Sequence, residues 1–322
     1  MIPQTAIIPL LSLLLLTHQT RATYTLFDSY TPENFFSKFD FFTGADPTKG
    51  HVKYLDEATA RREGLALEVI IDDKPAAYMA VDSINKAPNG RPSVRITSKK
   101  AYNQGLVIGD FLHMPNSTCG TWPAFWMVGD DWPKNGEIDI IEGVHMDLSN
   151  GMALHTDPGC KIEKKTEFKG KIESADCYVK AEGQGNNQGC RIVLEDNESF
   201  GDPLDSKGGG VYATLWTAES IKIWFFLRDD IPEDIEKGSP DPDSWGMPAA
   251  VFEGECEFDK KFKDLKIVFD TTLCGEWAGA VWESTDGCGS SAKTCKEFVS
   301  ENPDAFADSF WGVRYVKVYN KG

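Results

Sequence analysis

Residues 135–143 read Asn-Gly-Glu-Ile-Asp-Ile-Ile-Glu-Gly, a stretch that carries the acids Glu137, Asp139 and Glu142. Asn-Gly is a turn signal, and the alternation of acid and isoleucine after it has the period of a β-strand. Strict alternation would bury Glu142 among the isoleucines, where an unpaired carboxylate costs roughly several kcal/mol. We therefore expect one extra residue, a β-bulge around Ile140 and Ile141, which returns Glu142 to the face of the other two acids.

Three like charges on one face of a strand destabilise it, so a catalytic use is the favoured explanation. Glycoside hydrolysis needs one ionised carboxylate at the anomeric carbon and one protonated carboxyl at the leaving oxygen. Neighbouring negative charge raises the pKa of the proton-carrying member. A solvated acidic surface and a calcium site are the alternatives. Calcium, however, prefers acids and carbonyl groups on a loop.

The rest of the sequence predicts an all-β protein, specifically a two-sheet sandwich. Short apolar or alternating stretches, separated by turn signals, lie at 66–71, 93–96, 138–141, 212–217, 221–227, 265–269 and 312–318. Long polar loops are expected at 181–189 and 232–247, and one helix at 293–299. There is no internal repeat, so we expect a single domain over residues 23–322.

The first 22 residues are typical of a secretory signal peptide. An apolar run at 6–16 is too short to span a bilayer, and Thr20-Arg21-Ala22 offers a cleavage site after Ala22. The eight cysteines, an even number in a chain expected to be secreted, predict disulfides without specifying their pairing. Asn116 and Asn197 each begin an acceptor motif for N-glycosylation.

The net charge of −17 makes nucleic acid and anionic polysaccharides poor partners. A neutral polysaccharide is the better candidate. Nothing beyond the signal segment predicts a membrane partner, and we expect a monomer.

Several motifs resemble glycoside hydrolase family 16, and most closely its fungal laminarinase-like, or endo-1,3(4)-β-glucanase, branch. The acid strand carries the resemblance together with segments spread over nearly the whole chain: 120–127 (Gly-Thr-Trp-Pro-Ala-Phe-Trp-Met), Trp132-Pro133, 46–48 (Asp-Pro-Thr), 154–160, 208–213, 224–226, 231–232, 274–279 (Cys-Gly-Glu-Trp-Ala-Gly) and 311–319. Two residues between Asp139 and Glu142 are typical of this branch.

The resemblance implies a jelly roll of the concanavalin A type with a concave substrate cleft. It also implies a retaining mechanism, in which Glu137 is the nucleophile, Glu142 the acid/base, and Asp139 a hydrogen-bonding neighbour that tunes Glu137. It implies no metal and no organic cofactor in the reaction. The implied partner is a neutral β-glucan.

Aromatic and polar residues near the acids are candidates for sugar binding, because an indole packs well on the apolar face of glucose. They are Trp122, Trp126, Trp132 and Trp277, with Glu276 beside the last, and also His155 and Arg95. His155 could instead make only a structural hydrogen bond, and Arg95 only a structural salt bridge. We expect Trp216, Trp224 and Trp311 in the core and His145 on the surface.

Three functions are consistent with these features. Hydrolysis of β-1,3-glucan, and of mixed β-1,3/1,4-glucan, is favoured. A cell-wall transglycosylase on the same fold is the first alternative, since it shares the covalent intermediate. A glucan-binding lectin is the second, and the presence of all three acids weighs against it.

Overall fold

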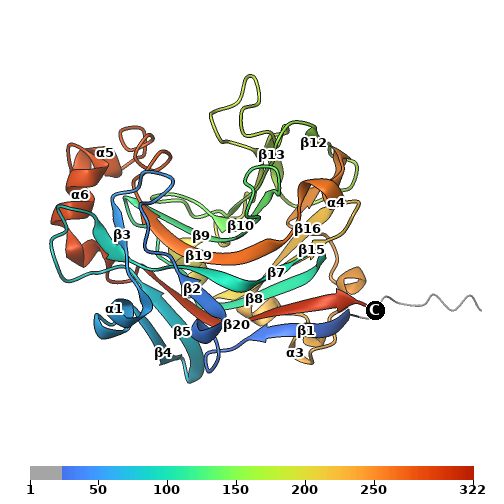
Figure 1. Ribbon diagram of the computed structural model, residues 1–322, viewed down its shortest axis with the longest axis horizontal. Helices are drawn as coiled ribbons and strands as arrows, with labels where there is room; N and C mark the ends of the chain where they lie inside the picture. Colours follow the sequence, from blue (N-terminus) through green and yellow to red (C-terminus); the bar gives the residue numbers. More distant parts are fainter. Residues whose placement is uncertain (1–23) are drawn as a thin grey trace, which may run out of the picture.

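The computed structural model describes residues 24–322, and most of them form two antiparallel sheets that lie one over the other (Figure 1). The predicted signal peptide lies outside the described residues. The first sheet is, in spatial order, β17 (Ala250–Phe252), β16 (Ile221–Leu227), β15 (Gly210–Trp216), β8 (Gly105–His113), β20 (Phe310–Lys321), β5 (Lys74–Ala80) and β4 (Ala66–Ile71), with β1 (Tyr24–Tyr30) also on β20. The second is β13 (Lys171–Ser174), β14 (Cys190–Val193), β11 (Gly151–His155), β10 (Glu137–Glu142), β9 (Thr121–Val128), β19 (Leu265–Leu273), β7 (Arg95–Tyr102) and β2 (Phe39–Phe41). The predicted β-sandwich is therefore confirmed.

Small elements connect and flank the sheets. Two further strand pairs form, parallel between β3 (Val52–Tyr54) and β6 (Arg91–Ser93), and antiparallel between β12 (Cys160–Ile162) and β18 (Gly254–Cys256). Short helical segments are α1 (Glu57–Arg62), α2 (Gly201–Ser206), α3 (Glu233–Glu236), α4 (Phe258–Lys261), α5 (Cys288–Ser291), α6 (Cys295–Glu301), η1 (Phe36–Lys38), η2 (Arg228–Asp230), η3 (Pro242–Ser244) and η4 (Pro303–Phe306).

The space between the sheets is filled by aromatic and branched side chains. Phe125 of β9 stacks on Phe269 of β19, with ring centroids 4.7 Å apart, and Trp311 of β20 meets Phe269 edge-on at 5.7 Å. The isoleucines of β10 are fully buried in this core. Burial of large apolar side chains is the main stabilisation of a sandwich, so β10 is held by its isoleucines while its other face stays available.

The expected core tryptophans are buried, but not all in the same place. Trp216 and Trp311 lie between the sheets, whereas Trp224 belongs to a separate cluster with Ile235 and Trp245. The last two come from the segment 232–247, which we expected to be a polar loop. Instead, it contains α3 and η3 and packs two apolar side chains against the outer face of β16.

Two element boundaries differ from the expectation. The stretch 93–96 is not one strand, because β6 ends at Ser93 and pairs with β3, whereas β7 begins at Arg95 and pairs with β19 and β2. The predicted helix begins two residues later than expected. Thr294 caps α6 by accepting a hydrogen bond from the Glu297 amide, and such a cap defines where a helix starts.

All eight cysteines are paired, in the disulfides Cys119–Cys288, Cys160–Cys256, Cys177–Cys190 and Cys274–Cys295. Two of these bonds attach the segment that carries α5 and α6, at the left of Figure 1, to the ends of β19 and β9. Long cross-links of this kind restrict the unfolded chain, and each contributes roughly 2–4 kcal/mol to stability.

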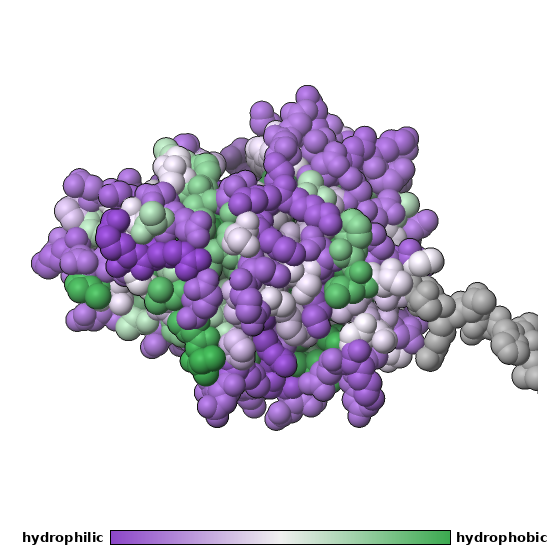
Figure 2. Space-filling view, turned by 60° about the horizontal axis from the view of Figure 1, so that its bottom comes forward, coloured by the Kyte–Doolittle hydropathy of each residue, from purple (hydrophilic) through white to green (hydrophobic). Residues whose placement is uncertain are grey.

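The lower side of the molecule, turned toward the reader in Figure 2, is mainly hydrophilic with small, separate hydrophobic patches. Among residues 24–322, the structure has no helix with the length and apolar character needed to cross a bilayer.

Peptide mapping after digestion without reduction should recover the four cysteine pairs given above, and intact mass analysis under denaturing conditions should detect no alkylatable thiol. The physical reason is that each pair has its two Cα atoms 4.2–5.8 Å apart, within reach of a disulfide. Recovery of different pairs, or labelling of several cysteines in the native protein, would contradict this arrangement.

Candidate active site

The bulge predicted from the sequence is present in β10. The register shifts between Asp139 and Glu142 against β11, and between Asp139 and Ile141 against β9. Ile140 and Ile141 both face the core, and the three acids Glu137, Asp139 and Glu142 all line one cleft of about 1140 Å³. The predicted common face of the three acids is therefore confirmed.

Small residues lie beside the acids on the neighbouring strands. Ala153 of β11 pairs with Asp139, and Gly151 of the same strand pairs with Glu142. Directly paired residues of an antiparallel sheet point to the same face. These two neighbours have little or no side chain, and the guanidinium of Arg191 occupies the space that a side chain at Gly151 would fill.

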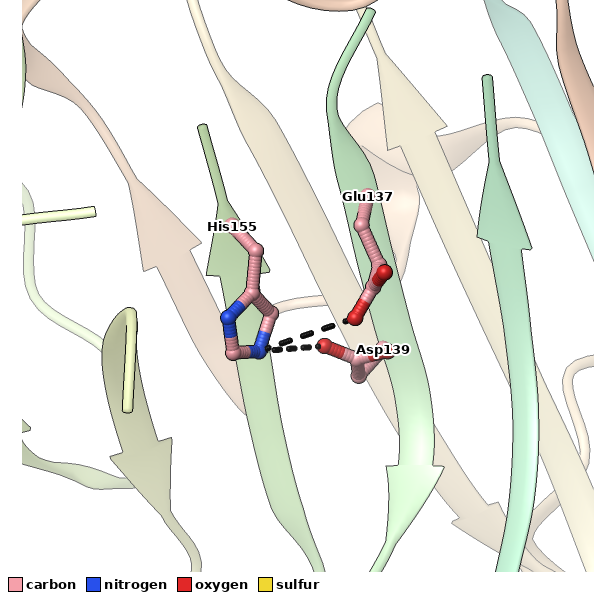
Figure 3. Close-up of side chains that lie close together, drawn as sticks. All are labelled: Glu137, Asp139 and His155. Atoms are coloured by element: carbon pink, nitrogen blue, oxygen red, sulfur yellow. Dashed lines mark ion pairs between the residues drawn. The ribbon is translucent and has the colours of Figure 1, made fainter. Parts of the chain in front are cut away.

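His155, a candidate for sugar binding, lies beside two of the acids (Figure 3). Its Nε2 atom is 3.1 Å from Asp139 Oδ2 and 3.8 Å from Glu137 Oε1. The pairing of β11 with β10 places it there, because His155 is the register partner of Glu137. The position fits both a structural contact and a contact with substrate.

Glu142 is oriented by two hydrogen bonds. Trp122 Nε1 donates to Glu142 Oε1 at 2.9 Å, and the Glu142 amide donates to the side-chain oxygen of Asn150 at 2.9 Å. Asn150 in turn donates to the carbonyl of Ile140 inside the bulge. The indole thus occupies Oε1 and leaves Oε2 without this contact.

Burial makes Glu137 and Asp139 hard to ionise. It raises the pKa of Glu137 to about 8, with the charge of Asp139 as the next cause. Burial also raises the pKa of Asp139 well above its usual range, helped by Glu142 and Asp270. Protonation of one carboxyl removes the charge that opposes ionisation of its neighbour, so these groups share protons as a set.

The tryptophans and the arginine expected to bind sugar all line the cleft. Trp132 is 41 % exposed and Trp126 is the register partner of Asp139. The guanidinium of Arg95 lies 5.0 Å from the Trp126 ring, while its Nη1 atom is 3.4 Å from Asp270 Oδ2. Arg95 thus makes the alternative salt bridge and faces the cleft at the same time, so its sugar contact stays a prediction.

Trp277 and Glu276 form part of the rim. Trp277 meets Trp122 edge-on, with ring centroids 5.4 Å apart. Glu276 is exposed and pairs with the ammonium of Lys49. Both residues line the cleft, and their contacts with a glucan stay predictions.

Among the charged residues that line the cleft, Asp270 and Arg191 were not predicted from the sequence. Burial raises the pKa of Asp270 to about 7 despite the neighbouring Arg95. Asp270 follows the apolar residues 267–269 of β19, and Arg191 precedes Ile192 and Val193 in β14. Arg95 lies in a similar apolar pattern, between Val94 and Ile96, and a charge in such a pattern needs a polar partner.

His145 is a correction, because it is buried and not on the surface. Its Nδ1 atom accepts a hydrogen bond from the Gly120 amide at 2.8 Å, so its Nε2 atom donates to the carbonyl of Ala278. Burial lowers its pKa, which keeps the ring neutral. The chain after β10 turns under the segment that carries α5, where His145 packs on Trp282, and the sequence carries no signal for that contact.

Among the described residues, Glu137, Asp139 and His155 are the group whose potential metal-ligand atoms come together, within 4.8 Å of one another. The same three groups provide the carboxyl and imidazole functions of acid–base chemistry. We assign no metal to them, and a reaction without a metal stays a prediction.

A family model described as XgeA-like, catalytic GH16 domain matches residues 39–319. The chain belongs to glycoside hydrolase family 16. It is 45 % identical over 304 residues to an endo-1,3(4)-β-glucanase of Arthroderma benhamiae, which covers 94 % of this chain and 66 % of the relative. A probable endo-1,3(4)-β-glucanase of Aspergillus niger is also 45 % identical, over 94 % of this chain and 40 % of the relative. The chain thus spans about half the length of these curated relatives.

Two solved structures of this family are similar over their whole length. An elongating family 16 β-1,3-glucosyltransferase is 42 % identical with a TM-score of 0.85, over 92 % of this chain. Laminarinase 16A of Phanerochaete chrysosporium, solved with 6-O-glucosyl-laminaritriose in its donor and acceptor sites, is 37 % identical with a TM-score of 0.86, over 93 % of this chain. The predicted family membership, and with it the prediction of a glycoside hydrolase, is confirmed.

Replacement of Glu137, a buried acid of this family 16 domain, should change how the free energy of unfolding depends on pH. A carboxyl whose pKa is raised by folding stabilises the protein below its unfolded pKa, and this stabilisation is lost as the pH rises through the folded pKa. For Glu137 the loss falls between pH 4.5 and about 8. The glutamine of Glu137→Gln cannot ionise. At pH 8 this variant should therefore have a free energy of unfolding roughly 1–3 kcal/mol higher than the wild type, and a higher unfolding temperature. At pH 4 the two proteins should unfold at similar temperatures.

Asp205 provides a matched control outside the cleft, because burial raises its pKa to about 8 as well. Asp205→Asn should reduce the pH dependence in the same direction without abolishing activity. Thermal unfolding followed between pH 4 and pH 8 tests both variants. A Glu137→Gln protein that is no more stable than the wild type at pH 8 would contradict the raised pKa.

Proposed function

We propose that this chain is a retaining endo-glycosidase that hydrolyses β-1,3-glucan, and also mixed β-1,3/1,4-glucan, through a covalent glycosyl-enzyme. The bulge in β10 carries this proposal, because it brings three carboxyl groups to one face of an open cleft. The names of the Arthroderma and Aspergillus relatives support the substrate. Residues 23–322 would form a single catalytic domain.

In this proposal Glu137 attacks the anomeric carbon, and Glu142 protonates the leaving oxygen through Oε2. A proton held by Asp139 removes the neighbouring charge that opposes ionisation of Glu137, so that Glu137 can attack as a carboxylate. After the leaving sugar departs, Glu142 removes a proton from water, and the water oxygen displaces Glu137 from the anomeric carbon. Every step uses a side chain that lines the cleft.

A transglycosylase is the second candidate, because the 42 % identical structure is that of a β-1,3-glucosyltransferase. Hydrolysis and transfer share the first half of the reaction and differ only in whether water or a sugar hydroxyl attacks the intermediate. A lectin is disfavoured, since binding alone does not require three carboxyl groups in a cleft.

We propose an extracellular location on the basis of the four disulfides, which persist in oxidising compartments. Asn197 is exposed and suits N-glycosylation. Asn116 is partly buried, and its side-chain oxygen accepts hydrogen bonds from Thr118 and Ser309.

Incubation with laminarin, barley mixed-linkage glucan and a purely β-1,4 glucan, followed by product sizing, tests the substrate. We expect endo-cleavage of the first, cleavage of the second and little of the third. The cleft is open along the sheet and lined by indoles, which suits an internal segment of a neutral chain. Activity confined to the β-1,4 polymer would contradict the proposed substrate.

Substitution of each glutamate tests its role. Glu137→Gln should abolish formation of the glycosyl-enzyme, because an amide is a very poor nucleophile. Glu142→Ala should retain slow turnover of substrates with activated leaving groups, which need no acid, and azide should then accelerate the second step. Glu276→Gln, on the exposed rim, is the control and should retain acid–base catalysis.

The anomer formed first distinguishes retention from inversion. Retaining enzymes have their two carboxyl groups about 5–5.5 Å apart, and inverting enzymes roughly 6.5–9.5 Å apart. Proton NMR during the first minutes of laminarin hydrolysis should show the β-anomer before mutarotation. An initial α-anomer would mean that water attacks directly, and the nucleophilic role of Glu137 would have to be abandoned.

A further inference from the structure

A second, smaller hollow of about 300 Å³ lies next to the cleft, and Arg191 is the residue that lines both. One wall of this hollow is the turn 146–149, which connects β10 to β11. Another is Asn197, which lies between β14 and α2. Its volume is at the lower end of the range for small-molecule sites, roughly 300–1,000 Å³. No step of the proposed reaction uses it.

The turn presents two apolar side chains to the hollow. Met146 is 47 % exposed and Leu148 is 40 % exposed. The backbone of the turn is held on both sides, because the Asp147 carboxylate accepts a hydrogen bond from the Val144 amide and Ser117 Oγ donates to the Asp147 carbonyl. The exposure of Met146 and Leu148 is therefore built into the turn, and a group that covers them would be stabilised by the apolar surface it removes from water.

The opposite wall carries an acceptor motif for N-glycosylation, Asn197-Glu198-Ser199. Asn197 is exposed and has a φ of 54°, a left-handed conformation that asparagine tolerates better than most residues. Ser149 Oγ donates a hydrogen bond to Asn197 Oδ1 at 3.1 Å. This bond engages the amide oxygen and not Nδ2, the atom to which a glycan is attached.

The other acceptor motif, at Asn116, has different surroundings. Asn116 is partly buried, and the hydroxyl groups of Thr118 and Ser309 both donate to its side-chain oxygen. It lines neither the cleft nor the smaller hollow. A glycan at Asn116 would have to fit among these packed side chains, whereas one at Asn197 begins in an existing hollow.

We infer that Asn197 carries an N-linked glycan whose first N-acetylglucosamine fills the smaller hollow and packs on Met146 and Leu148. In the transfer, Asn197 Nδ2 bonds to the anomeric carbon of an oligosaccharide on a lipid diphosphate. The bond from that carbon to the diphosphate oxygen breaks, and Nδ2 loses one proton. This inference rests on the proposed extracellular location and not on the proposed reaction.

The sugar suits this hollow for two reasons. A pyranose ring has an apolar C–H face and the N-acetyl group ends in a methyl group, so both can cover the thioether and the leucine. Covalent attachment also keeps the sugar at a high effective concentration, so that weak contacts are enough to hold it there.

The glycan would connect two turns that support the catalytic strand. The Asn150 amide, at the end of the first turn, donates to Ser199 Oγ of the acceptor motif at 2.9 Å. Asn150 is also the residue that bonds to the Glu142 amide within the bulge. A sugar attached to Asn197 and packed on residues 146–148 therefore joins the same two turns from the outside, and it should slow hydrogen exchange in residues 146–149.

Methionine oxidation measures the contact directly. The chain is exported from a yeast with its own N-terminal segment, treated with hydrogen peroxide, and analysed by peptide mass spectrometry. Met247 is the internal reference, because it is 51 % exposed and does not line the hollow. The ratio of Met146 to Met247 oxidation should be at least about threefold lower in the glycosylated wild type than in Asn197→Asp, since sulfoxide formation follows exposure.

Two controls separate the sugar from the substitution. Glu198→Gln keeps the acceptor motif and should behave like the wild type. An endoglycosidase that trims the glycan of the folded protein to its first N-acetylglucosamine should leave Met146 protected, because the first sugar makes the contact. Hydrolysis of laminarin should be similar in all of these proteins, since Asn197 does not line the cleft.

Each other outcome has a definite meaning. An unmodified Asn197 in the exported protein would overturn the inference, as would equal oxidation ratios in the wild type and Asn197→Asp, or loss of protection after trimming. A chain that the yeast does not export contradicts both the proposed location and this inference. A glycosylated protein with a protected Met146 that cleaves no β-1,3-glucan contradicts only the proposed function.

Discussion

The alternation of side chains between the two faces of strand β10 is the constraint on which the rest of the site depends. Its six residues contain three acids and three isoleucines, and a regular strand would leave Glu142 in the core. The bulge between Asp139 and Glu142 solves this, because it lets the isoleucines fill the space between the sheets while all three acids face the cleft. The side chain of Asn150 stabilises the irregular backbone by bonding both to the Glu142 amide and to the carbonyl of Ile140.

The cost of this arrangement is electrostatic, and the surroundings offset part of it. Burial raises the pKa values of Glu137 and Asp270 to about 8 and 7. On each side of β10 an arginine lies against an indole, Arg95 on Trp126 and Arg191 on Trp277. These cations bring positive charge near the acids without occupying the space between them. The aromatic core and the four disulfides stabilise the fold, whereas the buried acids destabilise it.

The sequence predicted the sandwich and the bulge because both follow from local patterns: period-two alternation, and one acid that falls out of phase. The apolar pattern around Arg95 predicted a polar partner for it, and the family resemblance predicted its contact with the glucan. Asp270 and Arg191 also lie beside apolar residues of their strands. The contacts of His145 and the packing of Ile235 and Trp245 were not predictable in this way. They depend on segments far apart in the sequence that meet only in the folded protein, and neither the spacing nor the composition of a loop specifies such a meeting.

The carboxyl groups alone cannot determine whether water or a sugar ends the reaction. A β-1,3-glucosyltransferase and a laminarinase are both similar to this chain, at 42 % and 37 % identity with TM-scores of 0.85 and 0.86. Both outcomes pass through the same intermediate, so the difference in free energy must come from groups that contact the attacking molecule. In this chain Trp122 donates a hydrogen bond to Glu142 and meets Trp277 edge-on, and the Trp277 ring in turn lies against Arg191. Side chains that bind a glucosyl unit firmly beside the reacting carbon raise the local concentration of its hydroxyl groups relative to water. The ratio of transfer to hydrolysis then rises, although the carboxyl groups are the same.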